Sequence, residues 1–519
     1  MIKGTTVATK KKTTRKKTAA PALPTVNPSG KGRTMAEVVE EGLKVYGAHT
    51  LEERALPDYR DGLTPVQRRT LWAAVTVGAV PPKASKKSAA IVGHTMGNYH
   101  PHGDASLYQS LVNLVNLPVP LFDGTGSFGS PALGIEAASQ RYTEARVSAF
   151  SMNTLLDQRL LDVTPMIPTF DGSKLEPLFL PSKLPVLLLN GARGIAVAAA
   201  TNIPAFTYAS VQKAVQIALE KRVKAKKRAA GLLANEDIYT VLKPLSPTGG
   251  KLISPPSVLR AMLETGRGAL RWRCDYDVDV KAKTVTITGF APGWSFQASV
   301  DRIRAHEDVA AIEDLSADQK LKVIIRFRKS CDMSGFDAFA DKHLTSSMTY
   351  SFNITQRFVT DNGGVKESSA KFRSVSVREL INLWLDWRIE HEVLAAGREA
   401  SNIAKDIERE EAFLTVITML DKVVALLKSK TVKDKVRALS KMLGCSHDIA
   451  QLVWQSPIGR FDRMKEGDQK AKIKALETAH AAAIAVTKSP AKHLLKELLA
   501  NPTGAEPTPK RRKRAVKQT

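Results

Sequence analysis

The chain is poor in cysteine, holds no long apolar segment and lacks a nucleotide-binding loop. Its three cysteines, Cys274, Cys331 and Cys445, lie far apart and form no C-x-x-C pair, which argues against a disulfide framework or a zinc site. No apolar run reaches the length of a membrane span, and no apolar signal segment follows the basic start. There is no G-x-x-x-x-G-K-[ST] motif. We therefore expect a cytoplasmic protein that contacts no membrane and hydrolyses no ATP by itself.

Positive charge is abundant and gathers in both tails. The formal net charge is +26 and the isoelectric point is about 9.8, which favours nucleic acid as the partner. Residues 1–33 hold nine Lys or Arg and no acid, and residues 510–519 hold six more. We expect residues 1–33 and 501–519 to be disordered basic tails that bind DNA without specificity. Nuclear or organellar targeting by these tails is the alternative.

A tyrosine beside an arginine is the main candidate for chemistry. In Arg141-Tyr142-Thr143-Glu144-Ala145-Arg146, the Tyr142 phenol could attack phosphorus. A free phenol has a pKa of about 10 and is a poor nucleophile at neutral pH, so it needs a neighbouring cation or base. Arg141 can supply that cation, and it can also bind a phosphate through two parallel hydrogen bonds.

The basic stretch upstream of Tyr142 predicts two short helices. A proline-punctuated loop from Arg54 opens onto a helix at Pro65, where proline suits the first turn. The turn Tyr99-His100-Pro101-His102-Gly103-Asp104 leads into an amphipathic segment that ends near Asn116. Two helices joined tightly within a basic region are typical of a helix-turn-helix.

Six motifs occur in a fixed order over this part of the chain. They are R-A-L-P-D-x-R-D-G-L-x-P-V-x-R-R from Arg54, K-K-S-A-x-x-V-G from Lys86, Y-H-P-H-G-D from Tyr99, D-G-x-G-x-F-G-S from Asp123, R-Y-T-E-x-R from Arg141 and G-I-A-V-x-x-A-T-N-I-P from Gly194. In these motifs the chain resembles the A-type component of type IIA DNA topoisomerases, the breakage-reunion subunit of gyrase and topoisomerase IV. The resemblance implies an α+β multidomain fold, with a winged-helix DNA-cleavage domain, an α/β tower domain and a long coiled-coil arm.

The resemblance also implies roles for individual catalytic residues. Tyr142 matches the nucleophile that joins to a 5' phosphate, and Arg141 matches the arginine beside it. Arg54, Arg68 and His100 match residues that hold the scissile phosphate and its neighbours. His100 would donate a hydrogen bond or shuttle a proton. For an isolated histidine before proline, a turn residue bonded to backbone is the alternative.

A second set of residues is expected to bind DNA without taking part in the reaction. It comprises Arg69, Lys86, Lys87, His102 and Ile195. Ile195 matches an apolar wedge that enters between base pairs and bends the duplex. The alternative is that Ile195 is a buried strand residue, although Gly191 and Gly194 favour an exposed hairpin tip.

The pattern and the resemblance together predict the domains. The winged-helix active-site domain spans 34–150 and the tower 151–370. In the tower, Cys274, Tyr276, Val278 and Val280 alternate with Asp275, Asp277 and Asp279, which predicts a strand, and on a strand these aspartates indicate a solvated face rather than a metal cage.

Residues 371–500 are expected to form an antiparallel coiled-coil arm with a dimer contact, the C-gate. No proline occurs between Pro292 and Pro457, and apolar residues recur at helical spacing at Leu414, Ile417, Leu420, Val424 and Leu427. The C-gate is expected around 430–455, with Val453, Trp454 and Ile458 beginning the return helix. An ordinary helical bundle has the same periodicity.

The resemblance finally implies partners and cofactors. The chain would form a homodimer within an A2B2 complex on double-stranded DNA, with a B-type subunit that binds ATP and most of the Mg²⁺. No metal site is expected in the chain itself. We expect ATP-dependent relaxation and decatenation rather than negative supercoiling, because no C-terminal wrapping domain follows the arm. A tyrosine recombinase-like enzyme and a noncatalytic basic DNA-bending protein are the alternatives.

Overall fold

A computed structural model describes residues 34–50, 54–131, 133–195, 200–225, 231–316, 321–362, 365–429 and 434–500. The two predicted basic tails, 1–33 and 501–519, lie outside these ranges. The chain divides into two compact units, Met1–Ala48 and His49–Thr519. The described part of the first unit belongs to helix α1 (Met35–Thr50), which carries exposed apolar side chains such as Val39 and Leu43. Together the elements make a mixed α/β protein.

Three helices and a small sheet form the region that carries the motifs. The helices are α2 (Pro65–Thr76), α3 (Ser88–Asn98) and α4 (Asp104–Val115), and they pack against one another. The antiparallel sheet has the order β1 (Lys86–Lys87), β3 (Glu144–Val147), β2 (Phe122–Thr125). Their core consists of buried apolar residues, among them Leu71, Ile91, Leu107, Leu111, Phe122 and Val147.

Helix α2 begins at Pro65, as the sequence predicts. Thr64 precedes it in an extended conformation, and its backbone amide donates to Oε1 of Gln67 at 3.0 Å. A proline in the first turn costs no hydrogen bond, because the first amides of a helix have no partner within it. The second predicted helix is also confirmed: α4 ends at Val115, with Asn116 as its C-cap.

The loop before α2 is buried, although loops usually run over the surface. Its charges are paired internally: Arg60 donates to both carboxylate oxygens of Asp58, at 2.8 and 2.7 Å. Asp58 also accepts the backbone amide of Arg357 at 3.0 Å, and Arg60 donates to the Arg357 carbonyl at 2.6 Å. The motif therefore ties this region to a hairpin that lies far along the chain.

Residues 149–374 alternate between short helices and antiparallel sheets. The helices are α5 (Ala149–Thr154), α6 (Gln158–Leu161), α7 (Val186–Asn190), α8 (Tyr208–Lys224), α9 (Asn235–Tyr239), α10 (Pro256–Thr265), α11 (Phe296–Arg304), the 3-10 helix η3 (Met333–Gly335) and α12 (Phe336–His343). Two hairpins pair β4 (Met166–Pro168) with β5 (Leu175–Pro177), and β15 (Asn353–Asn362) with β16 (Val365–Ser374).

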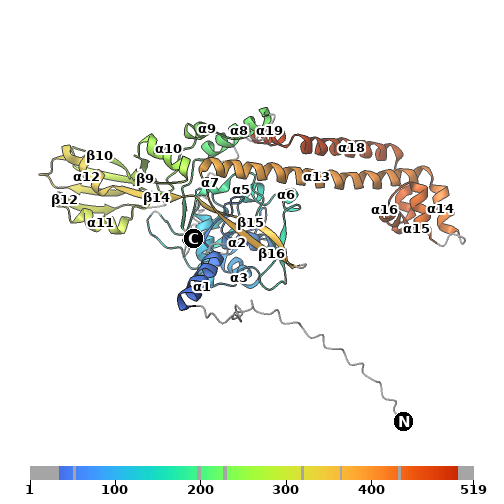
Figure 1. Cartoon of the computed structure of the whole chain (residues 1–519), viewed down its shortest axis with the longest axis horizontal. Coiled ribbons are helices and arrows are strands. Elements are labelled where there is room, and N and C mark those ends of the chain that lie inside the picture. The colour runs from blue at the N-terminus through green and yellow to red at the C-terminus, as the bar shows by residue number, and fades with distance from the viewer. Residues whose placement is uncertain are drawn as a thin grey trace, which may run out of the picture. The chain divides into compact units, whose positions relative to one another are not determined.

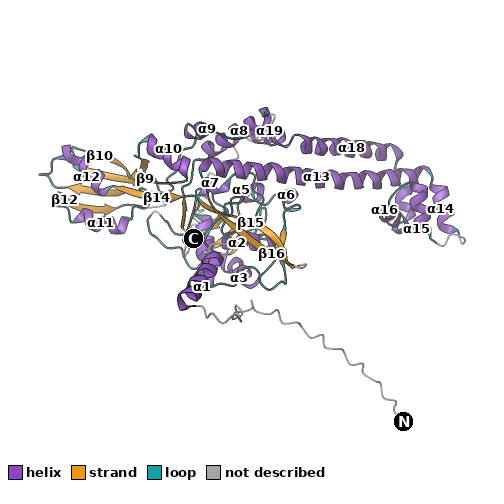
Figure 2. Ribbon diagram, viewed as in Figure 1, coloured by secondary structure: helices purple, strands orange, loops and turns teal. Residues whose placement is uncertain are grey.

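Two larger antiparallel sheets occupy the middle of the chain. The five-stranded sheet has the order β6 (Ala192–Ile195), β7 (Ala200–Ile203), β14 (Thr345–Ser351), β9 (Arg267–Arg273), β8 (Lys251–Leu252). The four-stranded sheet has the order β10 (Asp275–Asp279), β11 (Thr284–Gly289), β13 (Val323–Phe327), β12 (Val309–Asp314), and α11 and α12 lie beside it (Figure 2).

The predicted strand with alternating aspartates is confirmed as β10, which pairs with β11 across a turn. Of the apolar residues in the predicted alternation, Cys274, just before the strand, is 2% exposed, whereas Val278, within it, and Val280, just after it, are 39% and 62% exposed. Strand β10 lies at the edge of its sheet and pairs with β11 alone among the described strands.

A long helix follows, as the lack of proline predicts. The elements are α13 (Val377–Thr418), α14 (Leu420–Lys428), α15 (Lys435–Leu443), α16 (His447–Gln455), α17 (Ile458–Asp462), α18 (Glu466–Lys488) and α19 (Pro490–Ala500). Figure 1 shows α13 and α18 side by side. They run antiparallel: Glu410, late in α13, accepts from Gln469 at 2.6 Å, whereas Glu392, early in α13, lies 3.7 Å from His493 of α19.

Two predictions for this segment are wrong in detail. The return helix does not begin with Val453, Trp454 and Ile458, which lie in α16 and α17; it begins at Glu466. Ser456 takes an extended conformation before Pro457, because proline disfavours the helical conformation in the preceding residue.

The apolar stripe is also offset from the predicted one, and the helix is interrupted at Met419. All five predicted residues are only partly buried, although Leu420 and Leu427 pack against the core of this part. The residues that form the core of this part are their neighbours Ala412, Phe413, Val416 and Val423. None of the helices in the described ranges is both long and apolar enough to cross a bilayer.

Candidate functional site

Tyr142 lies in the turn that leads into strand β3, and its side chain is 64% exposed. Its backbone amide donates to the Ser139 carbonyl at 2.8 Å. The Arg141 guanidinium lies 4.5 Å from the centre of the Tyr142 ring and donates to the Ser139 hydroxyl at 3.1 Å. Arginine therefore stacks on the ring face, and among the described residues the phenol oxygen has no hydrogen-bond partner.

The next residue, Thr143, fixes the backbone under Tyr142. Its side chain is fully buried, and its hydroxyl donates to the Ser88 hydroxyl at 2.8 Å. Its hydroxyl oxygen also lies 2.9 Å from that of Tyr108, which donates its proton to the Ala138 carbonyl at 2.5 Å. These bonds join the start of α3, the middle of α4 and the end of the turn. Sequence reasoning missed all three hydroxyl residues, although Ser88 and Thr143 stand inside two of the motifs.

A glycine with an unusual backbone conformation lies next to this turn. Gly126 has φ +100°, which side-chain-bearing residues rarely adopt, and a Cβ there would lie 3.4 Å from the Tyr142 carbonyl oxygen. The glycine at position 126 is therefore explained by its backbone conformation, since a contact at 3.4 Å is an ordinary one.

Lys86 and Lys87 form strand β1, which pairs with the strand that follows Tyr142. Both are exposed, and they pair in register with Ala145 and Glu144 of β3. The Lys87 ammonium forms an ion pair of 2.9 Å with Glu144. The structure thus brings two of the predicted DNA-binding cations to the strand that follows the nucleophile candidate.

His100 and Arg69 form a second group, at the end of α3. The Nη1 of Arg69 lies 3.0 Å from Nδ1 of His100, and Arg69 also pairs with Glu176 at 2.9 Å. A guanidinium can only donate, so Nδ1 of His100 accepts, and the neutral ring carries its proton on Nε2. His102 is exposed and stacks on His100, with ring centres 4.2 Å apart. Glu176 is far away in sequence, and no local pattern marks it as the partner of Arg69.

The two remaining arginines occupy different environments. Arg54 is exposed at the start of the buried loop. Arg68 is 3% exposed and donates to both oxygens of Asp61, at 2.6 and 3.0 Å, and to the Leu63 carbonyl at 3.0 Å. Burial disfavours the Arg68 cation, but the Asp61 carboxylate outweighs it and the pKa of Arg68 lies above its ordinary value. This placement does not fit the phosphate contact that was predicted for Arg68; it fits a supporting role under α2.

Ile195 is not a buried strand residue. It ends β6, pairs with Ala200 of β7 and is 76% exposed, so the predicted exposure is confirmed. The predicted tip between Gly191 and Gly194 is wrong, because Ala192–Ile195 form a strand, and residues 196–199 lie outside the described ranges. The hairpin touches the loop that carries Arg54: a Cβ at Gly194 would lie 1.9 Å from the Ala55 carbonyl oxygen. Only glycine permits this approach, so Ile195 and Arg54 belong to adjoining pieces of backbone.

The described residues contain no group of three or more His, Cys, Asp or Glu that could hold a metal ion. Asp275 of the D-x-D-x-D strand accepts the Gly250 amide at 2.8 Å, and Asp277 and Asp279 are exposed.

Comparison with known proteins matches most of the chain to one family. The family model for the A subunit of DNA gyrase and topoisomerase IV matches residues 54–500. The DNA gyrase A subunit of Mycobacterium tuberculosis is 32% identical over 452 residues, which cover 83% of this chain and 51% of that protein. The DNA topoisomerase 4 A subunit of Caulobacter vibrioides is 40% identical over 271 residues, which cover 50% of this chain and 34% of that protein. The chain spans about half the length of the gyrase proteins that it matches.

Proposed function

Because this chain belongs to the A-subunit family of DNA gyrase and topoisomerase IV, we propose that it is the DNA breakage-reunion subunit of a type II topoisomerase. The observation that carries the proposal is the exposed Tyr142 phenol, stacked on Arg141 and anchored to α3 and α4 through the buried Thr143. A nucleophile that must reach a duplex has to stand at the surface, and its backbone has to be held still.

The proposed step is a transesterification on the DNA backbone. The Tyr142 oxygen forms a bond to the 5' phosphorus while the bond from phosphorus to the 3' oxygen breaks. The phenol gives up its proton and the leaving 3' oxygen takes one up, so the strand carries a free 3' hydroxyl. Religation reverses both bonds, and the number of phosphodiester bonds is conserved. Cutting and sealing therefore need no ATP.

The other predicted residues take roles that their surroundings support. Arg141 and Arg54 would neutralise charge on the phosphoryl oxygens, and the Nε2–H of His100 would donate a hydrogen bond to them. Arg69 would orient His100, and Lys86, Lys87 and His102 would contact neighbouring phosphates. We assign Arg68 to holding the buried loop through Asp61.

The proposal also assigns domains and partners to the chain. Helices α2 to α4 with the sheet β1–β3–β2 would form the winged-helix domain, and α13 with α18 the coiled-coil arm. Two copies of the chain would join a B-type subunit that supplies the ATPase and the Mg²⁺ site. Domain limits at 150 and 370, the C-gate, cytoplasmic location and a preference for relaxation and decatenation stay predictions.

The exposed Ile195 supports DNA bending as part of this function, and bending alone is the second candidate. Tyr142→Phe separates the two. With the partner B subunit, Mg²⁺ and supercoiled plasmid, the native chain should yield protein-linked linear DNA after denaturation. We expect Tyr142→Phe to reduce this product to background while DNA affinity changes by less than about threefold, because only the attacking oxygen is lost.

Tyr239→Phe, which removes a hydroxyl bonded to Glu264, is the matched control and should cleave normally. Equal capture by Tyr142→Phe would exclude Tyr142 as the nucleophile. If the native chain binds and bends DNA but forms no covalent link to it, the noncatalytic bending protein is the remaining candidate. A covalent link to the 3' end would indicate a recombinase-like enzyme.

A further inference from the structure

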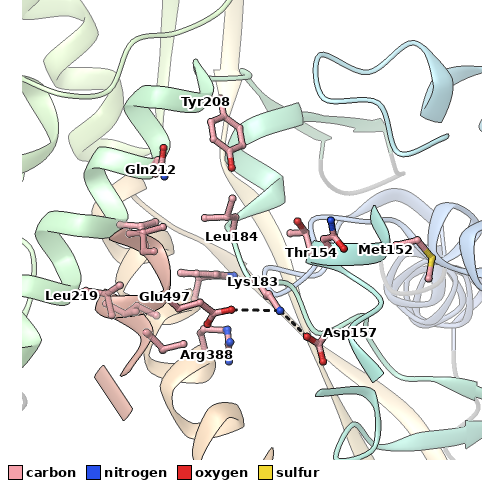
Figure 3. A pocket seen from close by; sticks show the side chains of 16 residues that line it. Met152, Thr154, Asp157, Lys183, Leu184, Tyr208, Gln212, Leu219, Arg388 and Glu497 are labelled. Atoms are coloured by element: carbon pink, nitrogen blue, oxygen red, sulfur yellow. Dashed lines mark ion pairs between the residues drawn. The ribbon is translucent and has the colours of Figure 1, made fainter. Parts of the chain in front are cut away.

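A cavity of about 450 Å³ lies apart from Tyr142, between α5, α8, α13 and α19. Figure 3 shows the side chains that line it. One part of its wall is apolar, with Val215 and Leu219 from α8, Leu385 from α13, and Leu494 and Leu498 from α19. The volume falls within the range of small-molecule sites.

Arg388 of α13 lines this cavity and is only 1% exposed. Its Nη1 donates to Oε2 of Glu392 at 2.8 Å, whereas Nε and Nη2 have no hydrogen-bond partner among the described residues. Nε and Nη2 share one edge of the guanidinium, and their hydrogens point the same way. That edge matches the two oxygens of a carboxylate, and unpaired buried donors are costly.

Apart from Arg388, the charged side chains that line the cavity are one lysine and two carboxylates that share it. The Lys183 ammonium lies 2.6 Å from Asp157 and 3.5 Å from Glu497, as the dashed lines in Figure 3 mark. Glu392 keeps a second partner, Arg159, at 2.6 Å. Because the carboxylates of Asp157 and Glu497 also line the cavity, a single negative charge suits the free edge of Arg388, and a dianion does not.

We propose that this cavity binds a small organic acid with one negative charge, whose carboxylate pairs with Nε and Nη2 of Arg388 and whose apolar body packs on α8 and α19. Such a ligand would join α19 to α13 at the base of the α13–α18 pair. The proposal is independent of the function proposed for Tyr142.

The test uses the full chain and 4-phenylbutyrate as the probe, with binding measured by isothermal titration calorimetry. We expect 4-phenylbutanamide, which lacks the charge, to bind about tenfold more weakly, since a charged hydrogen-bond pair is lost. Acetate, which lacks the apolar body, should also bind about tenfold more weakly. Equal affinity for the acid and the amide would overturn the proposal, as would no binding of the acid up to about 10 mM.

Two variants place the probe in the cavity. Arg388→Gln should lower the affinity for 4-phenylbutyrate to that of the amide, and Glu392 keeps Arg159 as its partner. Leu498→Trp should fill the cavity and abolish binding even if Arg388→Gln fails to fold. Leu499→Trp, at the neighbouring residue that is 53% exposed and outside the cavity, is the matched control. Unchanged binding by Leu498→Trp, or loss of binding by Leu499→Trp, would refute the assignment.

Discussion

At the scale of single residues, Arg54 and Arg68 carry the same charge in opposite surroundings. Arg54 is exposed, whereas Arg68 is 3% exposed and held by Asp61. The carboxylate of Asp61 also accepts the backbone amides of Leu63 and Leu180, each at 2.9 Å. Removal of Arg68 would leave a buried anion that organises two parts of the chain.

We therefore predict that Arg68→Met lowers the free energy of unfolding by about 3–5 kcal/mol, the cost of breaking a buried ion pair. Arg54→Gln should change it by less than about 0.5 kcal/mol and instead reduce the salt dependence of DNA binding by about one phosphate contact. Urea denaturation and fluorescence anisotropy with a labelled duplex measure the two effects. A stable Arg68→Met chain with weakened DNA binding would contradict this division of roles.

The sequence could predict features that depend on adjacent residues, but not contacts between residues that lie far apart in the chain. Arg141 beside Tyr142 and the helix start at Pro65 follow from adjacent residues. Glu176, the partner of Arg69, lies in the β4–β5 hairpin. No residue near Arg69 in the sequence therefore indicates that its guanidinium forms an ion pair. In the same way, a row of charges in a proline-punctuated loop suggests exposure, and only the pairing of Arg60 with Asp58 explains why that loop is buried.

At the scale of elements, helical periodicity predicted the long helix α13 but not the face that it buries. The predicted stripe contains Leu414, whereas the buried residue is its neighbour Phe413, at 1% exposure. Phe413 meets Phe461 edge to face at 5.5 Å, and the Arg460 guanidinium lies 4.9 Å from its ring centre. Apolar residues stand on both faces here, so spacing alone could not choose, and no Pro or Gly marks the interruption at Met419.

Phe413→Ala should therefore lower the free energy of unfolding by about 3–5 kcal/mol, because a buried aromatic ring leaves a cavity behind. Leu414→Ala, one position along the same helix and partly buried, is the matched control and should cost about 1 kcal/mol. Chemical denaturation followed by circular dichroism measures both. A larger loss for Leu414→Ala would restore the stripe that the sequence predicts.

At the scale of the whole molecule, buried charges join elements that are far apart in sequence. Glu392 of α13 pairs with Arg159 of α6 and Arg388 of α13. Burial alone would raise the pKa of Glu392, but its bonds to these arginines outweigh burial and lower the pKa to about 2. Its neighbour His391 is 3% exposed and lies 3.0 Å from the Leu160 carbonyl, and burial lowers the pKa of His391 to about 4.

His391 and Glu392 stabilise the fold over different pH ranges, and each contribution is lost as the pH falls through its own range. Between pH 6.5 and about 4, His391 binds a proton in the unfolded chain but not in the folded chain. The free energy of unfolding therefore decreases by about 3 kcal/mol as the pH is lowered through this range. The contribution of Glu392 is complete above pH 4.5 and is lost as the pH falls toward about 2. We predict that His391→Gln flattens the first range only, as measured by urea denaturation at a series of pH values.

The exposed His447 provides the control, since His447→Gln should keep the native pH profile. An unchanged slope between pH 6.5 and about 4 in His391→Gln would exclude His391 as its source.

The close approach of Gly194 to the Ala55 carbonyl would couple DNA bending by Ile195 to phosphate binding by Arg54. In the proposed function, a force that the duplex exerts on Ile195 would act on the hairpin and pass through Gly194 to the peptide next to Arg54, because no side chain lies between the two backbones. The residue that would bend the duplex, Ile195, and the residue that would bind its phosphate, Arg54, would therefore move together. A stiff duplex would resist both bending and phosphate binding.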